Sequence, residues 1–175
     1  MATYVNDLRL TELATGEGSG TWGTTTNTNL ELIGEALSYG TEAAFSSDAN
    51  ATTTVADGST DPARSLYYKV TSGASLTATR ELTIAPNTVS RVMIIENATS
   101  GSQIITIKQG SGATVNIPNG GVKLVYLDGA GSGAAVVEAT VDLDLTGTTT
   151  IAALTASGAI TSSGVITGSS VEATG

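Results

Sequence analysis

Apolar and polar residues alternate through most of the middle of this chain, which is the period-two pattern of β-strands. The alternation is clearest in Ile105-Thr106-Ile107-Lys108 and in Val122-Lys123-Leu124-Val125-Tyr126-Leu127. Turn-forming clusters such as Pro118-Asn119-Gly120-Gly121 separate the runs. The pattern predicts strands over residues 52–56, 66–71, 76–84, 89–96, 103–108, 113–117, 122–128 and 134–139. Strands at this spacing predict an antiparallel, jelly-roll-like β-sandwich over residues 42–141.

One helix is predicted near the N-terminus, over residues 29–39. Thr28 and Glu31 have the spacing of a capping box, and Gly40 stands where a glycine would end the helix. Large apolar residues recur at helical spacing, at Leu30, Ile33 and Leu37. A helix this short is marginal alone in water. We therefore expect its apolar stripe either to contact another chain or to lie on the sandwich.

The last part of the chain, residues 142–175, is rich in Gly, Ser, Thr and Ala and nearly free of charge. Single large aliphatic residues recur in it, several of them six residues apart: Leu145, Ile151, Leu154, Ile160 and Ile166. One such chain cannot bury these residues alone, which leaves disorder or an intertwined fibre of several chains. The low charge and the many β-branched residues favour the fibre. Three segments are thus expected: an N-terminal arm and helix over 1–41, the sandwich, and the start of a β-fibre shaft over 142–175.

Composition narrows the chemistry. The chain of 175 residues has no His and no Cys, and its formal net charge is −9. These facts exclude Ser-His-Asp and Cys-His catalysis and ordinary zinc sites, and they disfavour binding to nucleic acid. No apolar run is long enough to span a membrane, and the N-terminus lacks the pattern of a secretory signal peptide. The few, scattered basic residues are predicted to be solvated strand positions.

No catalytic residue, metal site or cofactor is predicted. The glycine-rich loops at 16–20 and 129–133 lack the Lys-Ser or Lys-Thr end of a phosphate loop. Asp142 and Asp144 alone supply too few oxygens for a calcium site. The sequons that begin at Asn50 and Asn97 are interpreted as surface turns.

Two segments resemble bacteriophage virion proteins. The stretch from Gly20 to Ile33, with its Trp-Gly pair, Asn-x-Asn and apolar helix, resembles a pattern near the start of phage tail fibres. The Asn-Ala-Thr-x-Gly turn at 97–101, the Ile-Thr-Ile-Lys strand, and the Tyr-x-Asp-Gly end at 126–129 resemble a β-rich module of phage tail proteins. In the order of these segments the chain is most similar to the N-terminal regions of fibres from marine, cyanophage-type podoviruses.

The resemblance implies a homotrimeric structural protein of the virion tail, assembled in the host cytoplasm. Its N-terminal region would attach to tail adaptor or nozzle proteins, and it would reach the host only indirectly, through a distal part that this sequence lacks. The residues expected to make the tail-anchoring or oligomer contacts are Leu8, Leu10, Trp22, Asn27, Asn29, Leu30, Ile33 and Leu37. The alternative for Trp22 is that its ring folds back on its own helix. The alternative for Asn27 and Asn29 is that they only cap the helix.

Three other classes stay open. A capsid decoration or head-fibre protein would belong to the same kind of virion but occupy a different site on it. A bacterial surface adhesin fragment is disfavoured by the absence of a signal peptide. An enzyme acting on polysaccharide would need an aromatic-rich cleft with paired carboxylates, and only 4% of the residues are aromatic.

Overall fold

The computed structural model describes residues 1–140, 161, 163 and 164. The chain divides into two compact units, Met1–Val141 and Asp142–Gly175. The five residues predicted to form the shaft core, and Asp142 and Asp144, lie outside the described residues. The helix and the strands of the described residues belong to the first unit.

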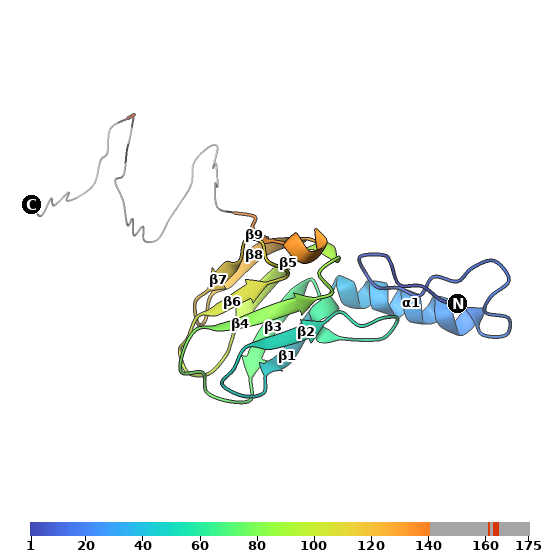
Figure 1. Cartoon of the computed structure of the whole chain (residues 1–175), viewed down its shortest axis with the longest axis horizontal. Coiled ribbons are helices and arrows are strands. Elements are labelled where there is room, and N and C mark those ends of the chain that lie inside the picture. Colours follow the sequence, from blue (N-terminus) through green and yellow to red (C-terminus); the bar gives the residue numbers. More distant parts are fainter. Residues whose placement is uncertain (141–160, 162, 165–175) are drawn as a thin grey trace, which may run out of the picture. The chain divides into compact units, whose positions relative to one another are not determined.

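The described residues form one α-helix, nine strands and two short 3₁₀ segments (Figure 1). In chain order these are α1 (Trp22–Ala36), β1 (Tyr39–Phe45), β2 (Ala51–Thr54), η1 (Pro62–Arg64), β3 (Tyr67–Ser72), β4 (Arg80–Ala85), β5 (Ser90–Asn97), β6 (Ile105–Lys108), β7 (Val115–Ile117), β8 (Val122–Asp128), η2 (Gly131–Gly133) and β9 (Val136–Glu138). The protein is therefore mainly β with one N-terminal helix, as expected, and α1 projects from one end of the two-sheet domain (Figure 1).

The two sheets are mixed, so the prediction of an antiparallel jelly roll was wrong. One sheet has five strands in the order β1-β3-β5-β8-β9, and the other has four in the order β2-β4-β6-β7. Strands β1, β3 and β5 pair in parallel, as do β2, β4 and β6. The pairs β5–β8, β6–β7 and β8–β9 are antiparallel.

The parallel pairing follows from how the chain turns. Each of the first five strand connections crosses from one sheet to the other, so the chain returns to a sheet from the same end each time. The winding is that of a short β-solenoid. The turn clusters in the sequence do separate strands, but most of them change sheet instead of closing a hairpin, and strand spacing alone does not distinguish the two.

The core lies between the sheets and takes one face of each. In β5, for example, Met93 and Ile95 are fully buried, and in β6 Ile105 and Ile107 are. Phe45 and Tyr68 add the bulk of aromatic rings. Burial removes the Tyr68 hydroxyl from water and raises its pKa well above the ordinary value, helped by its hydrogen bond to the Glu42 carboxylate.

The helix begins earlier and ends sooner than predicted. It starts at Trp22, after a turn in which Gly18 and Gly20 have positive φ angles. Thr21 is the N-cap but makes no side-chain capping hydrogen bond. The expected capping box is wrong, because Thr28 and Glu31 lie inside the helix. Gly40 does not end the helix either, since it belongs to β1.

Strand β1 was missed for the same reason. Its glycine looked like a helix terminator, whereas the backbone there passes so close to η1 that a β-carbon on Gly40 would lie 2.5 Å from the Pro62 carbonyl oxygen. Glu42 also interrupts the apolar pattern of this strand. Its carboxylate accepts hydrogen bonds from the hydroxyl groups of Thr53 and Tyr68. The strand is thus held by packing and side-chain hydrogen bonds that no local pattern reveals.

The loop after β5 is built around Asn97, which is fully buried. Its Nδ2 donates to the carbonyl oxygens of Gln103 and Ile117, at 3.0 and 2.9 Å. Its Oδ1 accepts from the backbone N–H and the hydroxyl of Thr99. Asn97 therefore joins β5 to the segment before β6 and to β7, and the interpretation of this sequon as a surface turn was wrong.

Candidate assembly surface

Arg64 fixes the N-terminal arm and α1 to the sheets. The side chain is fully buried, and its guanidinium donates to the carbonyl oxygens of Leu8, Ala56 and Ser59. It also forms ion pairs with Asp61 at 3.1 Å and with Glu35 of α1 at 3.4 Å. One cation thus connects the arm, the helix and the loop before η1.

The prediction that basic residues are solvated strand positions was wrong for this region. Arg91 is largely buried beside Arg64 and donates to its carbonyl oxygen. Burial lowers the pKa of Arg91, and the neighbouring Arg64 charge lowers it further. Burial disfavours the charged form of a carboxyl group as well, and it therefore raises the pKa of Asp61. A sequence gives no sign of such a cluster, because its members come from four separated segments.

The apolar stripe predicted for the helix is exposed to solvent. Leu30 is 61% exposed, Ile33 38% and Leu37 74%. The opposite face of the helix, with Leu32 and Ala36, is the one that the protein buries. We call the exposed set, Leu30, Ile33 and Leu37, the helix stripe. The expectation that this stripe lies on the sandwich is therefore wrong within the described residues of one chain.

The other predicted anchoring residues divide into two groups. Trp22 and Asn27 are exposed on α1, and the Trp22 side chain is 67% accessible. Asn29 is instead engaged within its own chain, where its amide accepts from the Thr11 N–H and donates to the Thr11 carbonyl oxygen.

Leu8 and Leu10 are half-buried in the arm. The Leu8 carbonyl oxygen accepts from Arg64, and both backbone groups of Leu10 are hydrogen-bonded to the Asn6 side chain. The backbone of both leucines thus helps to hold the arm in place.

The outer face of the five-stranded sheet carries two rows of large apolar residues, which the sequence pattern did not predict. Register places Tyr39, Tyr67, Ile94 and Leu124 in one row across four strands, and Val92, Tyr126 and Val137 in a second row. We call these seven residues the apolar sheet face. Val92 is 51% exposed and Tyr126 41%. The rings of Tyr39 and Tyr67 stack with their centroids 5.4 Å apart.

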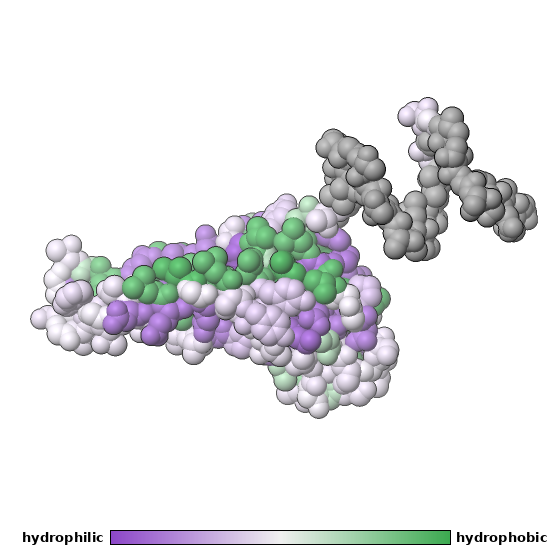
Figure 2. Space-filling view, turned by 180° about the vertical axis from the view of Figure 1, so that it is seen from behind, coloured by the Kyte–Doolittle hydropathy of each residue, from purple (hydrophilic) through white to green (hydrophobic). Residues whose placement is uncertain are grey.

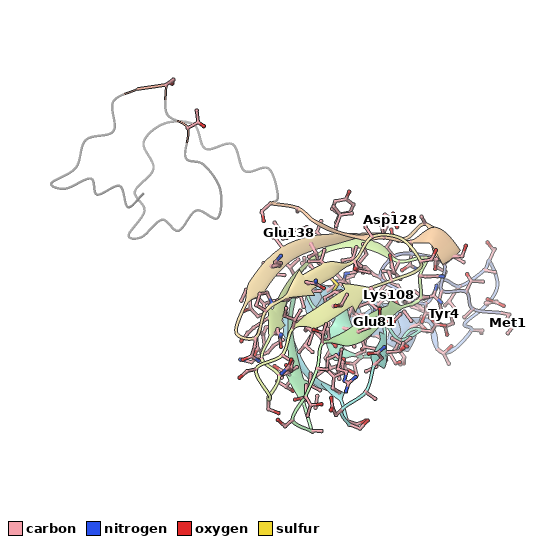
Figure 3. All side chains as sticks on the ribbon, turned by 60° about the vertical axis from the view of Figure 1, so that its left-hand side comes forward. Met1, Tyr4, Glu81, Lys108, Asp128 and Glu138 are labelled. Atoms are coloured by element: carbon pink, nitrogen blue, oxygen red, sulfur yellow. The ribbon has the colours of Figure 1, made fainter. Side chains whose placement is uncertain are left out.

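The outer face of the four-stranded sheet is the opposite in character. Its outward positions are almost all polar: Thr52, Thr54, Glu81, Thr83, Thr106, Lys108 and Asn116. Lys108 and Glu81 extend from neighbouring strands there and form an ion pair at 3.6 Å (Figure 3). The threonines and charges suit a face in water, and the contrast marks the apolar sheet face as the unusual one.

The helix stripe and the apolar sheet face are continuous. Leu37 at the end of α1 is separated from Tyr39 at the start of β1 by one residue. Figure 2 shows the resulting hydrophobic band, which runs along the helix and passes on to the sheets.

One ion pair sits beside the apolar rows, between Lys69 and Glu96 at 3.0 Å. This contact lowers the pKa of Glu96 and raises that of Lys69. The Tyr67 hydroxyl donates to the same carboxylate at 2.9 Å, which raises the pKa of the tyrosine. The charges of Lys69 and Glu96, at the centre of this face, therefore neutralise one another.

A groove of about 240 Å³ opens between β7 and the end of β9, and its lining includes Val115, Val136 and Val137. Its ionisable side chains, Lys123 and Glu138, are paired at 2.7 Å. The described residues contain no group of three or more acidic side chains placed to hold a metal ion, and no helix among them is long and apolar enough to cross a membrane.

Sequence periodicity could have revealed half of this surface. In β5 and β8 the alternation is interrupted by the adjacent apolar pairs Ile94-Ile95 and Leu124-Val125, and these pairs place large apolar residues on both faces of the strands. If all four residues are assigned to one core, the apolar outer face of these strands is overlooked. Tyr39 and Val137 could not be placed beside them without the strand order.

No family model, curated protein or solved structure gave a significant match to this chain. The resemblance to phage tail fibres therefore remains a prediction from the sequence.

Proposed function

We propose that the chain is a structural subunit of a virion fibre, in which three copies associate through their N-terminal domains to form part of a phage tail. The observation that carries the proposal is the continuous band formed by the helix stripe and the apolar sheet face. A chain with a formal net charge of −9 that exposes so much apolar surface in one band is suited to association.

The arm and helix suit attachment. Arg64 is paired with Glu35 of α1, and the helix projects from the sheets (Figure 1). The helix stripe is exposed on it. Trp22 at the far end of the helix offers a large apolar ring, the type of side chain that dominates binding energies at interfaces. The attachment role assigned to this end also draws on the resemblance of residues 20–33 to fibre N-termini. The count of three copies rests on that resemblance alone.

The place of the chain on the particle is testable by imaging. We would raise antibodies against the N-terminal domain, couple them to gold, and examine particles of the phage that encodes the chain. Label at the tail is the expected result. Label on the head would favour the head-fibre alternative, and particles without label would contradict a virion role.

A further inference from the structure

The inference rests on the proposed self-association and specifies where the copies meet. We propose that the apolar sheet face is covered by a second copy of this chain, so that the interface extends from α1 across the five-stranded sheet. The helix stripe alone would then be only part of the contact.

The difference between the two sheets is the first argument. Both sheets give one face to the common core, and both present the other face outward. The four-stranded sheet fills its outer face with Thr, Asn, Glu and Lys. The five-stranded sheet carries on its own outer face the seven large apolar residues of the apolar sheet face, together with polar residues such as Thr41, Lys69 and Glu96. Sheets with one solvated face normally alternate apolar inward and polar outward. The two apolar rows depart from that rule, so this part of the five-stranded sheet has the composition of a covered surface.

The distribution of charge over the chain favours a second copy as the partner that covers this face. Copies that each carry −9 repel one another unless they meet over neutral surface. The central part of the sheet face is neutral, because its Lys69 and Glu96 form an ion pair with each other. Asp128 lies at the rim, where its Oδ1 accepts from the N–H groups of Ala130 and Ala135. A basic partner would find its complement on other parts of this acidic chain, whereas this face suits another copy.

The available area agrees with a stable contact. Five strands spaced about 4.8 Å apart, the central ones some 25 Å long, make a face of roughly 450 Å². A helix of 15 residues adds a strip about 22 Å long and about 10 Å wide, or roughly 220 Å². Together they approach the roughly 800 Å² per partner of stable protein interfaces. The helix strip alone would fall far short.

The absence of cysteine from the chain provides the test. We would make Val92→Cys on the apolar sheet face and Thr52→Cys on the polar sheet as its matched control, since both replace an exposed β-branched residue in a strand. Tyr126→Cys supplies a second probe of the same face. The rate of thiol modification by N-ethylmaleimide would be measured on the full chain, and its mass by sedimentation, over a range of concentrations.

We expect Val92→Cys in the assembled protein to react about tenfold more slowly than Thr52→Cys, because thiol reactivity follows exposure, and we expect the two rates to converge when dilution yields monomers. Equal rates in an oligomer would overturn the inference and leave the proposed self-association intact. Slow reaction that persists in the monomer would show that the chain covers its own face, which also overturns it. A monomer at every concentration with equal rates would overturn both.

Discussion

Leu30→Ala should weaken assembly without unfolding the chain. The Leu30 side chain is 61% exposed in a single chain, so most of its apolar area is available to a partner. Full burial of a leucine contributes about 1.5–3 kcal/mol. After allowing for the methyl group that alanine keeps, the substitution costs about 1–1.5 kcal/mol per chain, or about 3–4.5 kcal/mol for three.

The effect on concentration can be calculated. The midpoint of a monomer–trimer equilibrium varies as the square root of the dissociation constant, so the loss should raise the midpoint concentration about 10- to 50-fold. Sedimentation velocity over a concentration series measures this midpoint. Within the monomer the substitution should cost less than about 1 kcal/mol, because the side chain is mostly exposed there.

Leu32→Ala is the matched control on the same helix. Leu32 is 2% exposed and packs against its own chain, so its truncation should lower the free energy of unfolding by about 2–5 kcal/mol. Thermal or denaturant unfolding of the two variants would separate the effects. An unchanged assembly midpoint for Leu30→Ala, or a loss of folding stability equal to that of Leu32→Ala, would refute the assignment of the helix stripe to an interface.

Three further predictions concern the β-domain. Asn97→Ala should lower the free energy of unfolding by about 3–5 kcal/mol, since it leaves buried backbone groups without partners; a loss below about 1 kcal/mol in urea unfolding would contradict the role of this side chain. The hydrogen bond from Arg80 holds the pKa of Asp48 well below its ordinary value, so the pair stabilises the fold above about pH 4 and loses this effect as the pH falls further. The unfolding temperature of Asp48→Asn should therefore decline less between pH 5 and pH 2 (approximate limits) than that of the wild type, and parallel declines would argue against the pair. Gly101→Ala should destabilise the fold strongly, because φ is +101° and a β-carbon would collide with the backbone of Leu76. Gly120→Ala, at φ +74° in open space, should cost only the strain of the backbone. Equal losses of stability for the two variants in thermal unfolding would contradict the close packing of Gly101 against Leu76.

The strands were the most predictable part of the fold. Residues 122–128 were predicted with the bounds of β8, because alternation and flanking glycines mark them clearly. The strand order was not predictable, since turns that cross between sheets use the same Gly, Ser and Asn residues as hairpins do. The helix was recognised by its stripe, but its start depends on the turn at Gly18 and Gly20, which pattern analysis treats only as a flexible loop.

The candidate surface was half predictable. Leu30, Ile33 and Leu37 were selected from their spacing, and the structure leaves all of them exposed. Their contact with a partner remains a prediction. The apolar sheet face was missed because Tyr39, Ile94 and Val137 become neighbours only through pairing of distant strands. Arg64 was missed because a buried cation has no local signature when its partners lie far apart in the sequence.

The mass of the full chain in solution shows whether its copies associate. Light scattering on chromatographically purified protein at micromolar concentration should give about three times the 17.4 kDa of one chain. The mass should hold or rise with added salt, because salt screens the repulsion between acidic copies and leaves apolar contacts in place. A stable mass of 17.4 kDa over the whole concentration range would contradict the proposed association of copies.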